Sequence, residues 1–254
     1  MNSLQRYVLQ ISFDGTPFNG WQRQKNAPSV QQEIEEKLSI ILGQETAITG
    51  CGRTDTGVHA NEFFLHFDAD KELSNYTHLH KLNTMLPPQI AVQNIYKVSL
   101  DFNTRFDALN REYVYLIHFN KNPFLIDKSL KLGKKNLDVN KMNQAANLLL
   151  EVEDFTSFSK VKTQTKTNNC DVTFAYWENI ENGIKFTIKA NRFLRNMVRA
   201  IVGTLIEIGE GKYDISHLET VILSKNREKA GYSVPAHGLS LTNIIYPKNT
   251  LLDE

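Results

Sequence analysis

The sequence of 254 residues predicts an α+β fold. Three observations lead to this prediction. Short runs of alternating or β-branched residues predict strands, and apolar residues at helical spacing predict helices between them. The two kinds of element do not follow a strict strand–helix–strand order, which argues against a doubly wound parallel sheet.

Seven segments have the pattern of strands. They cover residues 7–13, 63–67, 90–98, 113–118, 172–177, 184–190 and 241–245. Tyr113 and Tyr115 alternate along one of them, so both side chains point to the same face of the sheet. Packing in the sheet core is the alternative to a functional role for either tyrosine.

The first helix has clear start and stop signals. Ser29 and Gln32 form a capping-box pattern, and Gly43 ends the helix. Apolar residues line one of its faces at Val30, Ile34, Leu38 and Ile41. Further helices are expected at residues 138–150, 193–208 and 216–223.

The helix expected at residues 193–208 is associated with three arginines. Arg192, Arg195 and Arg199 are spaced three and four residues apart, which places them on one stripe beside the apolar face. A helix flank that faces solvent is the simplest interpretation of such a stripe. Arg192 and Arg195 are interpreted as surface or phosphate-contact residues.

The formal net charge of +1 is unevenly distributed. Residues 1–104 carry 8 lysines and arginines against 11 acidic residues, whereas residues 105–254 carry 21 against 17. The central stretch is rich in lysine, at Lys128, Lys131, Lys134, Lys135, Lys141, Lys160, Lys162 and Lys166. An RNA-binding surface needs a local basic patch of this kind, although lysine-rich loops are often simply solvated. The polar stretch at residues 160–169 is expected to be a mobile loop.

The composition also argues against several classes of protein. No run of about 18 apolar residues is present, so no transmembrane helix is expected, and the N-terminus lacks the pattern of a signal peptide. Cys51 and Cys170 are too few for a disulfide framework or a zinc site, and Cys51 is interpreted as a packing residue. A reduced, cytoplasmic protein is predicted. No metal and no nucleotide cofactor are expected, because no metal-ligand spacing and no glycine-rich phosphate loop is found.

Residues 50–60, with the sequence GCGRTDTGVHA, are the strongest candidate for chemistry. They place Asp55 two residues after Arg53, between Gly52 and Gly57. Glycines permit a sharp turn or the close approach of a ligand. A neighbouring positive charge favours the ionised carboxylate, which suits nucleophilic or acid–base chemistry on a negatively charged substrate. A tight turn with a structural Asp–Arg pair is the alternative interpretation.

This segment resembles the catalytic motif of the tRNA pseudouridine synthase A family. Other segments resemble motifs of the same family, in the same order and over nearly the whole chain. They are FDGTPFNGWQRQ at residues 13–24, RFDA and REYVY within residues 105–115, DFTSF at residues 154–158, NRFLRNMVR and IVG within residues 191–203, and PAHGL at residues 235–239.

The resemblance implies two similar α/β halves, residues 1–104 and 105–254. Their antiparallel or mixed sheets would join into one continuous sheet, with helices on one side and an active-site cleft between the halves. The implied reaction is the isomerisation of uridine to pseudouridine at positions 38, 39 and 40, in the anticodon stem and loop of tRNA. The implied assembly is a homodimer, and the reaction needs no cofactor.

The same resemblance assigns roles to individual residues. Asp55 corresponds to the nucleophile, which attacks either C6 of the base or C1′ of the sugar. Arg199 corresponds to the residue that pairs with this aspartate, and Arg53 adds a second positive charge. Tyr113 aligns with the tyrosine that holds the flipped base, and Leu239 contributes to the pocket wall.

Two histidines lie in these motifs, and neither is expected to act as a base, because the chemistry of the family uses no histidine. His59 is expected to order the motif loop by hydrogen bonding, and His237 to shape the pocket together with Leu239. Other functions remain open. They are a non-catalytic RNA-binding module, a synthase acting on another RNA, and a hydrolase of glycosidic bonds, which would need a second carboxylate beside Asp55.

Overall fold

The computed structural model describes residues 4–133, 136–160 and 166–251. The chain divides into two compact units, one of Met1–Leu109 with Leu241–Glu254 and one of Asn110–Ser240. The halves expected from the sequence, 1–104 and 105–254, have different bounds, because the C-terminal segment returns to the first unit as a strand. The α+β class is confirmed.

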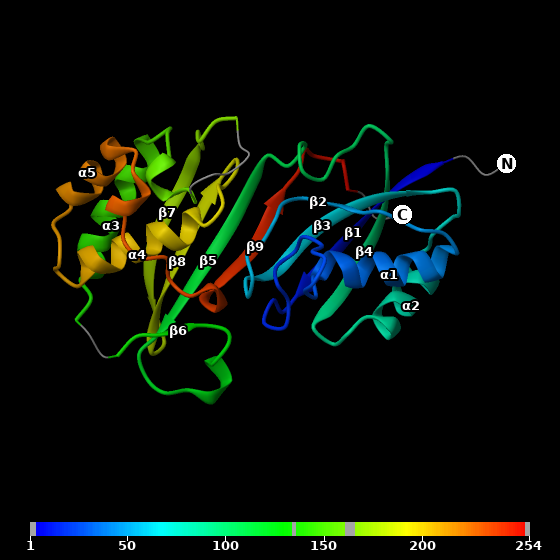
Figure 1. The fold of residues 1–254 in the computed structure, drawn as a ribbon, viewed down its shortest axis with the longest axis horizontal. Helices are drawn as coiled ribbons and strands as arrows, with labels where there is room; N and C mark the ends of the chain where they lie inside the picture. The colour runs from blue at the N-terminus through cyan, green and yellow to red at the C-terminus, as the bar shows by residue number, and fades with distance from the viewer. Residues whose placement is uncertain (1–3, 134–135, 161–165, 252–254) are drawn as a thin grey trace. The chain divides into compact units, whose positions relative to one another are not determined.

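The first unit is built on strands in the order β4-β1-β3-β9, in which β1 is antiparallel to β4 and β3, and β2 is antiparallel to β3. Two helices accompany these strands, and α2 packs against β4 and α1 (Figure 1). The elements are β1 (Gln5–Phe13), α1 (Val30–Leu42), β2 (Thr49–Gly50), β3 (His59–Ala69), α2 (Thr77–Met85), β4 (Ile90–Val98) and, from Leu241 onward, β9 (Leu239–Ile245).

The structure confirms the boundary signals of α1. The Ser29 hydroxyl accepts a hydrogen bond from the Gln32 backbone N–H at 3.3 Å, which satisfies one of the free N–H groups of the first turn. Gly43 adopts a left-handed conformation with φ of 75° and ends the helix. Val30 and Ile34 are fully buried, as the apolar stripe predicted.

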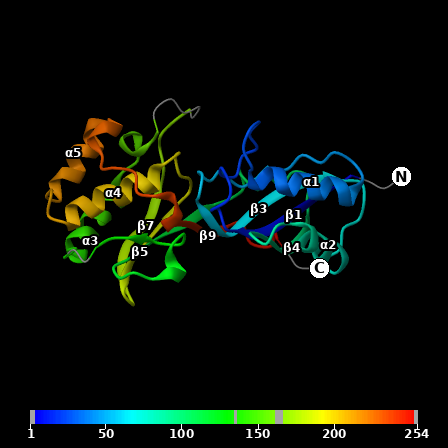
Figure 2. The ribbon, with the colours of Figure 1, turned by 60° about the horizontal axis from the view of Figure 1, so that its bottom comes forward.

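The second unit is a sheet in the order β5-β8-β7, with antiparallel neighbours and β6 parallel to β5. Helices α3, α4 and α5 group together beside this sheet (Figure 1 and Figure 2). The elements are β5 (Asn110–His118), β6 (Leu130–Lys131), α3 (Val139–Leu148), β7 (Val172–Ile180), β8 (Gly183–Ala190), α4 (Met197–Gly209) and α5 (Ser216–Ser224). Short 3₁₀ turns are η1 (Pro123–Leu125), η2 (Leu149–Glu151), η3 (Thr156–Phe158), η4 (Arg227–Lys229) and η5 (Ala236–Gly238).

The core of the second unit lies between the helices and the sheet. Helix α3 packs against β7 and α4 through the buried residues Met142 and Ala145. Trp177 and Phe186 come from neighbouring strands, and their ring centroids lie 4.8 Å apart. Burial of large aromatic rings is a major source of folding free energy, so this hairpin anchors the unit.

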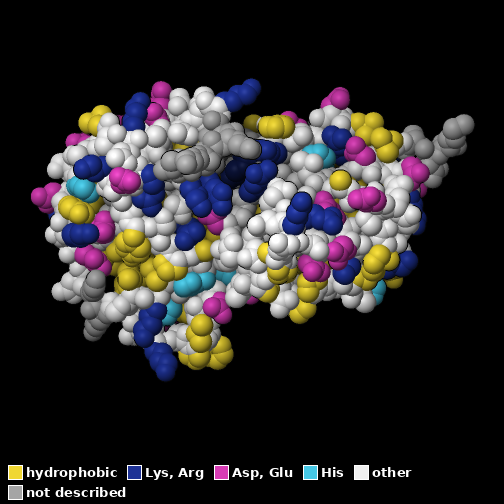
Figure 3. All heavy atoms as spheres, viewed as in Figure 1, with side chains coloured by type: hydrophobic (Ala, Val, Ile, Leu, Met, Phe, Trp, Pro, Cys, Tyr) yellow, Lys and Arg dark blue, Asp and Glu magenta, His cyan; other side chains and the backbone are white. Residues whose placement is uncertain are grey.

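The segment between β5 and β6 extends its hydrophobic side chains into solvent. Phe124 is 87% exposed and Ile126 is 64% exposed. Hydrophobic side chains gather at the tip of this loop below β6 (Figure 3). The loop is therefore not part of the core of the second unit.

One expected helix begins later than its sequence pattern indicates. Helix α4 starts at Met197 rather than at residue 193, because Asn196 has a positive φ of 67° that interrupts the helical backbone. Arg192 and Arg195 therefore do not lie on this helix, and the expected stripe of three arginines is wrong. Only Arg199 is helical.

Candidate active site

Asp55 lies in the loop that connects β2 to β3. The Asp55 side chain is half-buried, and Arg53, two residues earlier, is exposed. The Val58 N–H donates a hydrogen bond to the Asp55 carbonyl at 3.1 Å, and Gly57 between them has a φ of 77°. The loop thus turns tightly after Asp55 and leaves this residue partly exposed.

The segment at residues 13–24 packs directly against this loop. The Trp21 N–H donates to the Thr54 carbonyl at 3.3 Å. A Cβ at Gly20 would lie 2.5 Å from the same carbonyl oxygen, and a Cβ at Gly15 would lie 2.0 Å from the Val58 carbonyl oxygen. Both glycines are needed because the two backbones approach too closely for any side chain.

Aromatic packing stabilises the contact between residues 13–24 and the Asp55 loop. Trp21 is fully buried, and its ring centroid lies 4.1 Å from that of Phe63 on β3. Phe13 meets Phe63 edge-on at 5.6 Å. A Cβ at Gly50 would collide with the Trp21 indole at 2.6 Å, so β2 also lies against this ring. The loop therefore rests on a rigid hydrophobic base.

His59 links the start of β3 to the Asp14–Gly15 turn. The Gly15 N–H donates to His59 Nδ1 at 3.1 Å, and Asp14 Oδ1 lies 3.0 Å from the same nitrogen. The imidazole is almost completely buried. The structure thus gives His59 the ordering role expected from its motif. Cys51 is also buried, as expected for a packing residue.

Tyr113 and Tyr115 lie on β5 in the second unit, but their surroundings differ. Tyr113 is half-buried, and its ring meets Phe193 edge-on with centroids 5.1 Å apart. Tyr115 is completely buried and its hydroxyl donates to the Pro235 carbonyl at 2.8 Å. Burial raises the pKa of Tyr115 far above its ordinary value. Tyr115 is therefore a core residue, whereas Tyr113 keeps part of its ring accessible.

Arg199 is held near the start of α4. Its Nε donates to the Val234 carbonyl at 2.7 Å, and the Val234 N–H donates back to the Arg199 carbonyl at 3.2 Å. The side chain is half-buried. The reciprocal hydrogen bonds fix the direction in which the guanidinium leaves the helix.

Leu239 and His237 lie where the chain passes from η5 into β9. Leu239 is 5% exposed, and His237 is half-buried. A Cβ at Gly238 would lie 2.7 Å from the Tyr115 ring. This packing fixes both residues relative to β5.

The expected site residues are divided between the two units. Arg53 and Asp55 share the loop of the first unit, and Tyr113, Arg199 and Leu239 belong to the second. The contacts of residues 13–24 with this loop were not predicted, although the glycines in their motif were a signal of close backbone approach.

The expected basic surface is described only in part. Lys160 and Lys166 are exposed, whereas Lys134, Lys135, Lys162 and residues 161–165 of the expected loop lie outside the described residues. Over residues 4–133, 136–160 and 166–251, no group of three or more His, Cys, Asp or Glu residues has the arrangement of a metal site. Within the same ranges no helix is both long and apolar enough to cross a membrane.

Comparisons with known proteins agree with the motifs. The family model for tRNA pseudouridine synthase matches residues 10–107 and 145–247. A protein of Porphyromonas gingivalis named tRNA pseudouridine synthase A is 44% identical over 253 residues, which cover 98% of this chain and 100% of the relative.

Proteins of the same name from two other organisms are also similar over nearly their whole length. The relative from Azobacteroides pseudotrichonymphae is 45% identical, with 96% of this chain and 98% of the relative covered. The relative from Francisella philomiragia is 37% identical, with 96% and 95% covered. The chain therefore belongs to the tRNA pseudouridine synthase family, and it is an isomerase that acts on RNA.

Proposed function

We propose that this enzyme converts uridine to pseudouridine at positions 38, 39 and 40 of tRNA, with Asp55 as the nucleophile. The observation that carries the proposal is the presentation of Asp55. Its loop is held by close backbone contacts from Gly15 and Gly20, while Asp55 itself remains partly exposed. A precisely held anionic side chain next to an exposed arginine suits attack on a nucleoside of a polyanion.

The proposed reaction balances without a cofactor. The bond between N1 of uracil and C1′ of ribose breaks, and a bond between C5 and C1′ forms. C5 loses its proton to solvent, and N1 gains one. The target nucleotide must first leave the stack, because its reacting atoms are inaccessible within a helix.

Each group of residues takes one part of this task. Asp55 attacks either C6 of the base or C1′ of the sugar. Arg199 and Arg53 supply positive charge and occupy the position that the flipped base leaves. Tyr113 holds the uracil ring while it turns, and its edge-on contact with Phe193 fixes the plane of its own ring. Leu239 forms part of the pocket wall.

Incubation with unmodified tRNA, followed by digestion to nucleosides, separates this function from its alternatives. The proposal predicts pseudouridine. Unchanged uridine would indicate a non-catalytic RNA-binding protein, and free uracil would indicate a hydrolase. A tRNA with cytidine at positions 38, 39 and 40 is the matched control and should yield no pseudouridine. Formation at full rate in this control would place the target elsewhere in the RNA.

We also propose that the enzyme acts as a symmetric homodimer, the commonest closed assembly of identical chains. A tRNA is longer than one chain of this size, so a second subunit would extend the surface that recognises it. Light scattering coupled to gel filtration should give twice the mass of one chain. A fully active species with the mass of a single chain at micromolar concentration would contradict the dimer.

A further inference from the structure

A segment between η4 and η5, here called the strap (residues 230–235), runs along α4. It is hydrogen-bonded to the helix at two levels. The reciprocal bonds between Arg199 and Val234 form the first. The Gly231 N–H donates to the buried Thr204 hydroxyl at 2.9 Å and forms the second. The strap therefore contacts α4 over more than one helical turn, from Arg199 to Thr204.

The strap is also fixed to β5. The buried Tyr115 hydroxyl donates to the Pro235 carbonyl at 2.8 Å, one residue beyond Val234. Tyr115 stands two residues after Tyr113 on the same strand. The strap therefore connects the helix that carries Arg199 with the strand that carries Tyr113.

Arg227 holds the strap in its bend. Its Nη1 donates to the Gly231 carbonyl at 3.0 Å and to the Ala230 carbonyl at 3.3 Å, and its Nη2 donates to the Ser233 hydroxyl at 2.8 Å. Within the part of the chain that the structure describes, no carboxylate pairs with Arg227. Burial lowers the pKa of its guanidinium. The planar guanidinium thus donates its hydrogen bonds to neutral backbone carbonyl and hydroxyl oxygens.

Ser233 links Arg227 to the residue that precedes α4. Its hydroxyl oxygen also lies 2.7 Å from Asn196 Nδ2, which donates to it. Asn196 is the residue with positive φ that precedes the helix, three positions before Arg199. One serine therefore joins Arg227 to the helix start, and the next residue in the chain, Val234, accepts the hydrogen bond from Arg199.

We propose that Arg227 is a positioning residue for Arg199. It fixes the strap through Ser233 and Gly231, the fixed strap presents the Val234 carbonyl, and this carbonyl directs the Arg199 guanidinium. The inference rests on the proposed function, in which Arg199 acts on the reacting nucleotide. A group that is misdirected by even a small distance loses most of its effect on the transition state.

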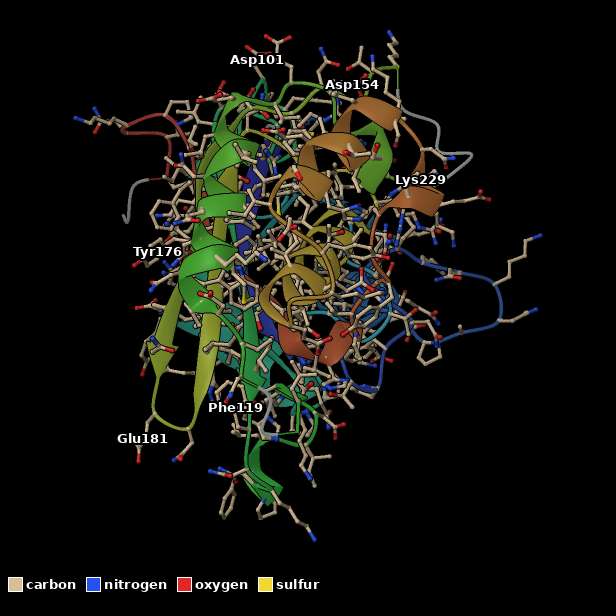
Figure 4. The ribbon with its side chains drawn as sticks, turned by 90° about the vertical axis from the view of Figure 1, so that its left-hand side faces the viewer. Asp101, Phe119, Asp154, Tyr176, Glu181 and Lys229 are labelled. Atoms are coloured by element: carbon tan, nitrogen blue, oxygen red, sulfur yellow. The ribbon has the colours of Figure 1, made fainter. Side chains whose placement is uncertain are left out.

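The substitution Arg227→Lys tests this inference, since lysine keeps the positive charge but cannot span three acceptors as a planar fork. We expect kcat with tRNA to fall by at least about tenfold while KM changes less than about threefold. Ser233→Ala removes the link to Asn196 and should lower kcat in the same way, which covers the case in which Arg227→Lys fails to fold. The matched control is Lys229→Gln in the same exposed turn (Figure 4), which should keep the wild-type kcat.

A double-mutant cycle separates positioning from general structural support. In an Arg199→Ala background, Arg227→Lys or Ser233→Ala should cause no further loss of kcat. Losses that multiply, or a wild-type kcat in both Arg227→Lys and Ser233→Ala, would overturn the inference while leaving the proposed function intact. A wild-type rate in Arg199→Ala would instead overturn the role of Arg199 in the proposed function, and this inference with it.

Discussion

At the scale of single residues, the conformation of the Asp55 loop depends on two glycines of a neighbouring segment, which have no side chain. Gly15 and Gly20 belong to one motif and Asp55 to another, yet a Cβ at either glycine would collide with the backbone around Asp55. The sequence indicated that both motifs matter. It did not indicate that they meet, because close backbone packing between distant segments leaves no periodic pattern in the residues.

The first prediction concerns Gly15. Gly15→Ala would force the two loops apart, because the new Cβ would lie 2.0 Å from the Val58 carbonyl oxygen. We expect a loss of at least about 2 kcal/mol in the free energy of unfolding, measured by urea denaturation. The control is Gly52→Ala in the Asp55 loop, where a Cβ meets nothing within 4 Å. Equal stability of the two variants would contradict the described contact.

The second prediction concerns the buried His66 on β3. Its Nδ1 lies 2.9 Å from the Thr104 hydroxyl and accepts from the Thr104 N–H at 3.3 Å, an arrangement that suits the neutral ring. Burial, and then the nearby charge of Arg6, lowers the pKa of His66. The unfolded chain therefore binds the proton more readily than the folded protein.

The free energy of unfolding should consequently fall as the pH decreases below about 6.5, by about 1.4 kcal/mol for each unit of pKa depression. The decrease should level off below the pKa of the folded state. In His66→Asn, urea denaturation between pH 7.5 and 5 should show a weaker dependence on pH. The exposed His80 gives the control, since His80→Asn should keep the wild-type dependence. Equal pH dependence in His66→Asn and wild type would contradict the assignment.

At the scale of elements, the sequence predicted most of what the structure shows. The capping signals placed α1 between Ser29 and Gly43, and the apolar stripe identified its buried face. Helix α2 was missed, because Leu82 is its only buried residue and gives no periodic pattern. The start of α4 was placed too early, since the apolar residue Leu194 extends the helical pattern past Asn196, where the backbone turns left-handed.

The third prediction concerns Tyr113 on β5. Tyr113→Phe keeps the ring that packs on Phe193 but removes the hydroxyl. In the proposed function the ring holds the base, and the hydroxyl is a hydrogen-bond donor and acceptor that can take part in proton transfer. We therefore expect kcat to fall about 10- to 100-fold while the affinity for tRNA stays near wild type. Single-turnover kinetics and filter binding measure the two quantities. A loss of affinity with an unchanged rate would assign Tyr113 to binding alone.

At the scale of the whole molecule, the division of the chain was only partly predictable. Leucine and β-branched residues identified the strand near the C-terminus, but not that Leu241–Glu254 belongs with the first unit. Local composition indicates whether a segment forms a strand or a helix. It does not indicate that β9 pairs with β3, because pairing between strands far apart in the sequence depends on how their side chains pack. The division of charge was visible in the sequence, because it is a property of composition alone.

The fourth prediction concerns that charge. Affinity for tRNA should fall steeply with salt, because each lysine or arginine that binds a phosphate releases counterions. Neutralising Lys160, Lys162 and Lys166 together should reduce the slope of log affinity against log salt by roughly 0.7 to 0.9 for each phosphate that these lysines neutralise in the wild-type complex. The same substitutions at the exposed Lys71, Lys81 and Lys97 of the first unit are the control and should leave the slope unchanged. An unchanged slope in the first variant would show that those lysines are only solvated.

The central claim is that Asp55 is the nucleophile of a uridine isomerase, and tritium release tests it most directly. Because the proposed reaction replaces the hydrogen at C5 of uracil, a tRNA labelled with tritium at C5 of uridine releases its label to water with each turnover. The wild-type enzyme should release tritium in step with pseudouridine formation. Asp55→Asn, nearly isosteric but unable to act as an anionic nucleophile, should bind the same tRNA and release none above background. Release by pure, folded Asp55→Asn at a substantial fraction of the wild-type rate would contradict the claim.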